Sequence, residues 1–111
     1  KHYNMDGTLV AEGHYEKGVK DQYWFFYHFN GKRKAEGHYR KGKKENWWNI
    51  YNTQGKLVEK CQYKDNRLNG YRVLLRHGNP YKVELYERGK KQKEWTNYTR
   101  FLIDHPQLLG S

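Results

Sequence analysis

The sequence predicts an all-β protein: an elongated, single-layer antiparallel sheet of repeated β-hairpins, about 24 residues per repeat, with a short C-terminal cap for which a helix is one option. Three observations predict this fold: an internal period, two turn signals within each period, and aromatic-rich stretches between the turns. High aromatic content with few branched aliphatic residues also points away from a helical bundle, because buried area must come mostly from flat rings.

The period is visible in several columns of the sequence. Gly7, Gly31 and Gly55 recur at intervals of 24 residues, and Gly78 follows after 23. Three further columns keep the same spacings, one of tyrosine, one of glycine or asparagine, and one of tryptophan with a single arginine: Tyr15, Tyr39, Tyr63, Tyr86; Gly18, Gly42, Asn66, Gly89; Trp24, Trp48, Arg72, Trp95. Agreement between independent columns indicates a structural repeat.

Each repeat carries two turn signals, represented by Asn30-Gly31 and Lys41-Gly42. Both place glycine where a tight hairpin turn needs a positive φ. The stretches between them, rich in Tyr, Trp, Phe and Val, are typical of strands. We therefore expect about four hairpin repeats over residues 1–98, the first incomplete, and a capping tail over residues 99–111.

Two-residue turns predict which residues face each other across the strands. The first turn pairs Trp24 with Gly37 and Trp48 with Cys61, and the second pairs the same indoles with Ala11 and Ala35. Each indole would then lie across small residues on one packed face. That face is expected to carry further apolar side chains: Leu9, Tyr15, Phe26, Tyr39, Ile50, Leu57 and Tyr63.

The third repeat departs from the pattern. Arg72 stands in the tryptophan column and Glu59 in the alanine column, so the two are expected to form an opposite-charge cross-strand pair. The residue missing before Gly78 shifts Tyr71, Val73, Leu75, Val83 and Leu85 to the opposite face. We expect the tail to cover them with its apolar residues: Phe101, Leu102, Ile103, Leu108 and Leu109.

Two strings carry a family resemblance. Ala11–Gly18 (AEGHYEKG) and Ala35–Gly42 (AEGHYRKG), each followed by an aromatic strand, resemble the bacterial MORN-repeat-variant family. The resemblance covers about residues 3–98 and weakens from Arg72 onward. It implies a sheet of stacked hairpins that serves as a scaffold for proteins or anionic lipid surfaces. Some members of the family are antitoxin-like partners of a toxin, others are appended to larger bacterial proteins, and the family has no catalytic residues.

Composition limits the cellular setting. The single cysteine, Cys61, excludes an internal disulfide and any cysteine-based zinc site, so a reducing compartment, the cytoplasm, is slightly favoured. No apolar run is long enough for a membrane span or a signal peptide. Because residues 3–7 align with residues 27–31, the chain begins in the middle of a repeat. We expect a trimmed piece of a larger protein, with an incomplete first cap as the alternative.

No pattern of residues predicts chemistry. His14 and His38 occupy the same column, so about 9.5 Å separates them, too far for two ligands of one zinc ion. The glutamates at 12, 36 and 59 are spaced by the repeat, which indicates a structural role. We therefore predict that the protein is not an enzyme and binds no metal, cofactor or small-molecule substrate.

Two surfaces are candidates for binding. An aromatic sheet face is predicted to dock a protein partner, unless other repeats or another domain cover it: Tyr23, Phe25, Tyr27, Trp47, Tyr51 and Tyr71. The edge with the inter-repeat turns forms a basic rim in a chain of net charge +10: Lys17, Lys20, Arg40, Lys41, Lys43, Lys44, Arg88, Lys90, Lys91 and Lys93. This rim suits an anionic membrane surface, or it only solvates the edge and discourages aggregation.

The leading prediction is a protein-interaction or scaffolding module. Peripheral binding to anionic lipids is the first alternative, and a structural spacer in a larger enzyme or surface protein is the second. Binding of single-stranded nucleic acid ranks below these, because the rings repeat at structural columns and no RNA-binding signature accompanies them.

Overall fold

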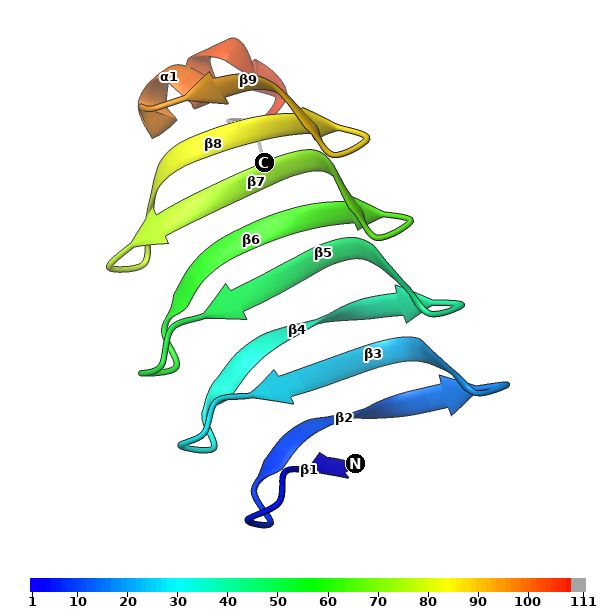
Figure 1. The fold of residues 1–111 in the computed structure, drawn as a ribbon. Coiled ribbons are helices and arrows are strands. Elements are labelled where there is room, and N and C mark those ends of the chain that lie inside the picture. The colour runs from blue at the N-terminus through cyan, green and yellow to red at the C-terminus, as the bar shows by residue number, and fades with distance from the viewer. Residues whose placement is uncertain (109–111) are drawn as a thin grey trace.

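The computed structural model describes residues 1–108, which form one open, antiparallel sheet whose nine strands are neighbours in chain order (Figure 1). The strands are β1 (His2–Tyr3), β2 (Leu9–Glu16), β3 (Val19–Tyr27), β4 (Arg33–Arg40), β5 (Lys43–Tyr51), β6 (Leu57–Lys64), β7 (Arg67–Arg76), β8 (Asn79–Glu87) and β9 (Lys90–Trp95). A helix, α1 (Tyr98–Asp104), and a 3-10 turn, Pro106–Leu108, follow. The predicted fold class is confirmed.

The hairpin turns follow the sequence signals. Gly31 and Gly42 have φ values of 83° and 84°, and Asn66 has a φ of 71°. The residue before each inter-repeat turn glycine is also left-handed: Lys17 and Lys41 have φ values of 51° and 50°. In the inter-repeat turns, positive φ at both central positions matches the right-handed twist of the flanking strands, which explains why they close two-residue hairpins. The two-residue turn predicted at Asn30-Gly31 is wrong: the His28 N–H donates to the Lys32 carbonyl at 2.8 Å around three residues, and of the two signal residues only Gly31 has a positive φ.

Backbone hydrogen bonds tie successive hairpins together at the inter-repeat turns. The Gly42 N–H donates to the Lys20 carbonyl at 2.8 Å, and the Gly89 N–H donates to the Leu68 carbonyl at 2.8 Å. Beside the first of these, the Lys41 N–H donates to Asp21 Oδ1 at 3.2 Å. Each of these turns is therefore hydrogen-bonded to the first strand of the preceding hairpin.

The predicted register is right on one side of each tryptophan strand and wrong on the other. Trp24 pairs with Gly37 and Trp48 pairs with Cys61, as expected. On the other side the indoles face Gly13 and Gly37 instead of the two alanines. The cause is a bulge that shifts the register by two residues and contains a left-handed residue, Gln22 (φ 62°) in β3 and Asn46 (φ 60°) in β5.

The two tryptophans form the core of the face that carries them, here called the tryptophan face. Trp24 is 0% exposed and Trp48 is 1% exposed although no second layer covers them. Each indole lies flat over the glycine of the preceding strand, where an added Cβ atom would overlap the ring. The Trp48 indole N–H donates to the His38 carbonyl at 3.1 Å, and Tyr39 packs edge-on at 5.1 Å between ring centroids.

Arg72 replaces tryptophan with an ion cluster. The guanidinium contacts Glu59 at 2.9 Å, which confirms the expected pair, although Arg72 stands directly opposite Cys61 instead of Glu59. Its other branch contacts Glu84 at 2.8 Å. Glu84 was not among the partners predicted from the sequence.

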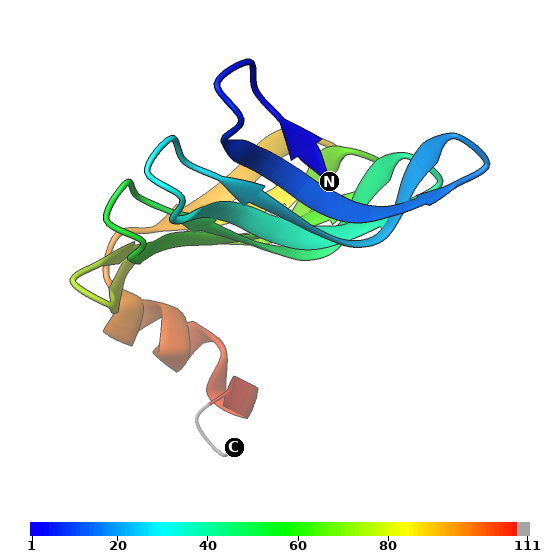
Figure 2. The same ribbon diagram turned by 90° about the horizontal axis from the view of Figure 1, so that it is seen from below.

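Helix α1 covers the opposite side of the sheet at its β9 end (Figure 2). Phe101 packs with Val83 and Trp95, and Tyr71, Val73, Leu85 and Leu102 surround this cluster. The prediction that the tail covers this face is confirmed for Phe101 and Leu102. It is wrong for Ile103, which is 56% exposed, and for Leu108, which is 46% exposed. Leu109 lies outside the described residues.

Trp95 shows what the missing residue before Gly78 does. It pairs with Val83, and Val83 pairs with Val73, so all three side chains lie on the side opposite the tryptophan face. Trp95 therefore keeps its place in the sequence column but turns to the other face. There its indole N–H donates to Asp104 of α1 at 2.9 Å.

Phe101→Ala is expected to lower the free energy of unfolding by about 3 kcal/mol. The Phe101 ring is the part of α1 that is buried against Val83 and Trp95 of the sheet, so its removal leaves a cavity at the centre of this cluster. Urea denaturation followed by tryptophan fluorescence would measure the change. Ile103→Ala, in the same helix but 56% exposed, is the matched control and should change stability by less than about 1 kcal/mol. Equal losses in the two variants would contradict the cap.

Candidate functional site

The aromatic surface predicted from the sequence lies on the side opposite the tryptophan face. We call its uncovered part the tyrosine face, defined by Tyr23, Phe25, Tyr27, Trp47 and Tyr51 of β3 and β5. Tyr23 is 39% exposed and Trp47 is 42% exposed, while the other three are half-buried. Cross-strand neighbours form one row from Phe25 through Asn49 and Val73 to Trp95, so these residues lie on the same side of the sheet. Because Phe101 of α1 packs on Trp95, the helix covers the far end of the side that carries the tyrosine face.

Glu36 of β4 lies at the centre of the tyrosine face. Glu36 is 9% exposed, and its carboxylate accepts hydrogen bonds from the hydroxyls of Tyr23, at 2.6 Å, and Tyr51, at 2.9 Å. Arg33 adds an ion pair at 2.9 Å. One carboxylate therefore fixes two tyrosines from the strands on either side of it.

Polar and charged side chains also contact the rings of Tyr27 and Phe25. The Tyr27 hydroxyl donates to Glu12 at 3.1 Å, so the repeat-spaced glutamates have the structural role that the sequence predicted. The Arg33 guanidinium lies 4.6 Å from the centre of the Phe25 ring, within cation–π distance. The exposed ring faces are thus presented in fixed orientations.

Burial and the Glu36 network shift the ionisation of these groups. Burial, the hydrogen bond to Glu36 and the charge of that carboxylate raise the pKa of Tyr23 to about 12. Burial alone would raise the pKa of Glu36, but the hydrogen bonds from Tyr23, Tyr51 and Arg33 hold the pKa below its usual value. Near neutral pH the network is therefore an ionised carboxylate with two neutral phenols.

Glu36→Gln should lower the pKa of Tyr23 from about 12 toward 10, the ordinary value, because it removes the carboxylate charge but leaves the burial. Titration of the assigned Tyr23 ring resonances between pH 9 and 13 would measure the shift. Tyr39 is the control, since burial alone raises its pKa, and it should titrate unchanged in the variant. An unaltered Tyr23 titration would mean that the Glu36 carboxylate does not raise the pKa of Tyr23.

Tyr71 does not belong to the tyrosine face, contrary to the prediction. Its ring packs edge-on against Phe101 at 5.6 Å, and its hydroxyl lies 3.1 Å from His105 Nε2. Helix α1 therefore occupies the surface that Tyr71 would present. The sequence indicated that the tail would cover this region, but it did not separate Tyr71 from the exposed rings.

The basic rim is less uniform than the sequence suggested. Lys20 and Lys44 extend over the tryptophan face, where the Lys44 ammonium lies 5.0 Å from the Trp48 and Tyr63 ring centres. Lys93 lies 4.9 Å from the Trp95 ring centre, and Lys91 forms ion pairs with Glu84 and Glu94. These four cations are engaged within the sheet. The other six rim cations are exposed: Lys17, Arg40, Lys41, Lys43, Arg88 and Lys90.

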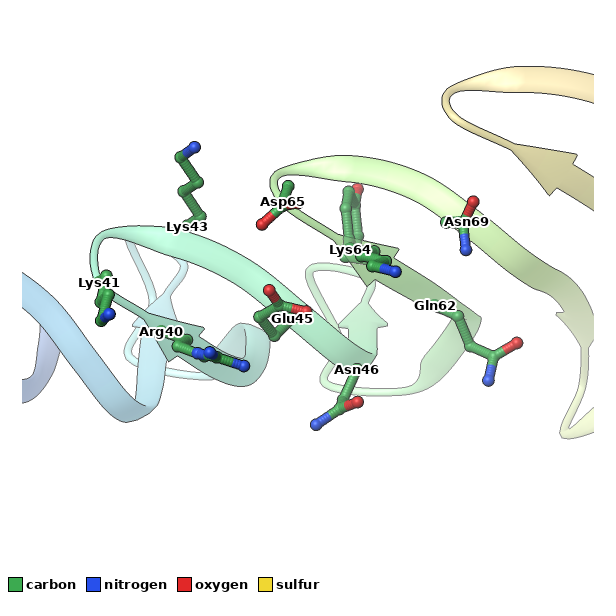
Figure 3. Close-up of a pocket in the computed structure, with 10 residues that line it drawn as sticks. Arg40, Lys41, Lys43, Glu45, Asn46, Gln62, Lys64, Asp65 and Asn69 are labelled. Atoms are coloured by element: carbon green, nitrogen blue, oxygen red, sulfur yellow. The ribbon is translucent and has the colours of Figure 1, made fainter.

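Polar depressions lie between neighbouring turns of the rim. One, of about 630 Å³, is lined by Arg40, Lys41, Lys43 and Lys64 together with Glu45 and Asp65 (Figure 3). Lys43 points to the opposite side from Asn46 and Gln62, so the lining side chains do not all face the same space. Two carboxylates among four cations leave a weak positive excess and no preformed anion site.

The tryptophan face, which the sequence predicted to be packed, holds a shallow apolar depression. It has a volume of about 500 Å³, and Ala11, Phe26, Ala35 and Ile50 line it. The signal for it was the alanine column: two small side chains opposite Phe26 and Ile50 leave space between the larger residues.

Cys61 of β6 stands opposite Trp48 of β5 and is 0% exposed, as expected of a structural thiol. Burial, with the nearby Glu59, raises its pKa to about 12, so the thiolate is suppressed. Within residues 1–108, no three His, Cys, Asp or Glu side chains are grouped so that they could hold a metal ion. In the same range, no helix is both long and apolar enough to cross a membrane.

Comparison with known proteins returned no matching family model and no matching curated protein. The resemblance to MORN repeat variants therefore stays a prediction, carried by the two octapeptide strings and the period of 24 residues.

Proposed function

We propose that this protein is a non-catalytic interaction module that docks a protein partner through the tyrosine face. The observation that supports this most is the combination of exposed rings and fixed hydroxyls: Tyr23 is 39% exposed while its hydroxyl is held by Glu36 at 2.6 Å. Exposed aromatic surface of this kind is typical of protein interfaces, in which Tyr, Trp and Arg supply most of the binding energy.

The fixed rings favour binding for a second reason. Ordering a side chain at an interface costs about 0.5–1.5 kcal/mol, and the Glu36 network has already ordered Tyr23, Tyr51 and Arg33 in the free protein. Trp47 adds a large ring, 42% exposed, in the strand that carries Tyr51. The partner would then bind a preorganised surface in which aromatic side chains are the anchors and the Glu36 network supplies polar contacts.

Binding to anionic lipid through the basic rim is the second candidate. The net charge of +10 and the exposed cations at Lys17, Lys41 and Lys43 favour it. It ranks below protein docking because Lys20, Lys44, Lys91 and Lys93 are occupied by rings and carboxylates of the sheet.

Trp47→Ala is expected to weaken partner binding by about 2 kcal/mol or more, roughly 30-fold, if Trp47 is an interface anchor. Photo-crosslinking from position 47 in cells would identify the partner, and calorimetry with the purified partner would give the affinities. Phe29→Ala is the matched control: Phe29 is 82% exposed in the turn between β3 and β4 and is not part of the tyrosine face as defined, so its loss should leave the affinity unchanged. Sedimentation with liposomes of neutral and anionic composition tests the lipid alternative.

Equal affinities of the Trp47→Ala and wild-type proteins would remove the tyrosine face as the docking surface. Binding to anionic but not neutral liposomes, abolished by charge reversal of Lys41 and Lys43, would favour the lipid alternative. A thermal melt of each variant confirms that it is folded before its binding is compared.

A further inference from the structure

Trp47 presents a hydrogen-bond donor that the described part of the chain does not use. The indole N–H groups of Trp24, Trp48 and Trp95 donate to acceptors of the protein at 2.9, 3.1 and 2.9 Å. The Trp47 N–H has no acceptor within residues 1–108, and Trp47 is 42% exposed. This indole is therefore free to donate a hydrogen bond to a partner.

Tyr23 and Trp47 are equivalent residues of consecutive repeats and lie on the same side of the sheet. Tyr23 is on β3 and Trp47 is on β5, with β4 between them (Figure 1). Because neighbouring strands are about 4.8 Å apart, the two rings recur at about 9.5 Å in the direction that crosses the strands. The next member of this series, Tyr71, packs under α1. The tyrosine face thus offers two exposed rings at one fixed interval.

This interval distinguishes between the conformations that a partner segment could have. A polyproline II helix has three residues per turn, so its residues i and i+3 lie on one side at about 9.3 Å. Side chains on one side of a β-strand recur at about 6.7 Å, and residues i and i+7 of an α-helix are about 10.5 Å apart. Of the three conformations, polyproline II matches the ring interval best, to within about 0.2 Å.

The polar groups of the tyrosine face also suit a proline-rich segment. Both oxygens of Glu36 already accept hydrogen bonds, so this carboxylate is occupied. Lys60 is exposed, stands opposite Val73 and therefore lies on the same side, and it has no ion pair within the described residues. The unused Trp47 N–H and the Lys60 ammonium are donors. A proline-rich segment offers a carbonyl at every residue, and its prolines bring no N–H that would need an acceptor.

We infer that the tyrosine face binds a proline-rich segment of a partner protein in the polyproline II conformation, with two prolines three residues apart and an acidic residue beyond the second. The prolines pack on Tyr23 and Trp47, the Trp47 N–H donates to a carbonyl of the segment, and Lys60 pairs with its carboxylate. This inference rests on the proposed function and names the chemistry of the partner. A second copy of the chain does not supply such a segment, because its two prolines are Pro80 and Pro106.

Titration of the ¹⁵N-labelled chain with the blocked peptide APAAPAEA tests the inference. We expect a saturable shift of the Trp47 indole N–H resonance, which is assigned by its absence from the Trp47→Phe variant. In the matched peptide AAPAPAEA the first proline moves by one position, so the two prolines no longer have the ring interval. This peptide should bind about tenfold or more weakly.

Protein variants test the two donors separately. Trp47→Phe keeps an aromatic ring but removes the N–H, and it should weaken peptide binding about fivefold. Lys60→Glu should weaken binding of APAAPAEA and strengthen binding of APAAPAKA, in which lysine replaces the glutamate. Lys64→Glu, an equal charge change at an exposed position of the same strand, is the matched control and should leave both affinities unchanged.

The absence of a saturable shift at Trp47, equal binding of the two spaced peptides, or shifts confined to the tryptophan face would overturn the inference. These outcomes are separate from a failure of the proposed function, which is tested with the crosslinked partner. A partner that loses affinity for Trp47→Ala but crosslinks through a segment without this proline spacing would retain the tyrosine face as the docking surface and refute the polyproline II ligand.

Discussion

Gly37→Ala is expected to lower the free energy of unfolding by about 3 kcal/mol, the upper end of what overpacking usually costs. The added methyl group would overlap the indole of Trp48, which is 1% exposed and already fixed by its hydrogen bond to the His38 carbonyl. The ring cannot move toward solvent without losing that bond. Urea denaturation at neutral pH would measure the loss.

A double-mutant cycle shows whether the clash is the cause. Trp48→Ala alone should cost about 4 kcal/mol through lost burial. In the Trp48→Ala background, Gly37→Ala should be neutral or stabilising by up to about 1 kcal/mol, because alanine is favoured over glycine in a strand once the indole is gone. Additive losses in the double variant would contradict the packing of the indole over Gly37.

Arg72→Met should cost about 3 kcal/mol at neutral pH, because it leaves the carboxylates of Glu59 and Glu84 without their shared cation. The Glu84 side chain is 5% exposed, so water does not replace the lost bonds. Chemical denaturation would measure the loss. Arg76→Met is the matched control in the same strand: Arg76 is exposed, stacks on Tyr81, and should cost less than about 1 kcal/mol.

The loss in Arg72→Met should depend on pH. Burial alone would raise the pKa of Glu84, but hydrogen bonds from Arg72, Lys91 and Tyr86 lower it from 4.5 to about 2. A lowered pKa stabilises the folded state above the unfolded value of 4.5, and this stabilisation disappears as the pH falls through 2. The difference between wild type and variant should therefore shrink from pH 5 to pH 2. A constant difference would mean that Glu84 ionisation does not contribute.

The period of the sequence was enough to predict the strands, the turns and the two faces. Tight turns leave few alternatives once glycine or asparagine recurs at fixed positions, and Trp24 opposite Gly37 followed directly. The bulge was missed, although Gln22, Asn46 and Gly70 share a column and all have positive φ. Asparagine and glycine often adopt a positive φ, but glutamine rarely does. Because the first residue of the column is Gln22, the column did not indicate a left-handed position, although Asn46 and Gly70 are typical of one.

The candidate surfaces were predicted less completely, because side-chain direction decides them. The sequence placed Tyr23, Trp47 and Tyr51 on one side correctly, but nothing local indicated that Glu36 would bind two of these phenols. Tyr71 was assigned to the exposed rings because only the three-dimensional path of α1 covers it. Lysines such as Lys20 and Lys44 have long stems, and their direction over a ring cannot be inferred from spacing alone.

The burial of Trp24 and Trp48 within the plane of the sheet has a consequence for how the protein can change in evolution. Each indole packs on its own strand and the two beside it, and Trp48 also contacts Phe26 of β3, so the contacts of this core stay within neighbouring hairpins. Among the regular units before Arg72, duplication or loss of one 24-residue unit would recreate junctions of the same kind, with an indole over a glycine. The length of the sheet is thus free to vary while the local architecture stays constant.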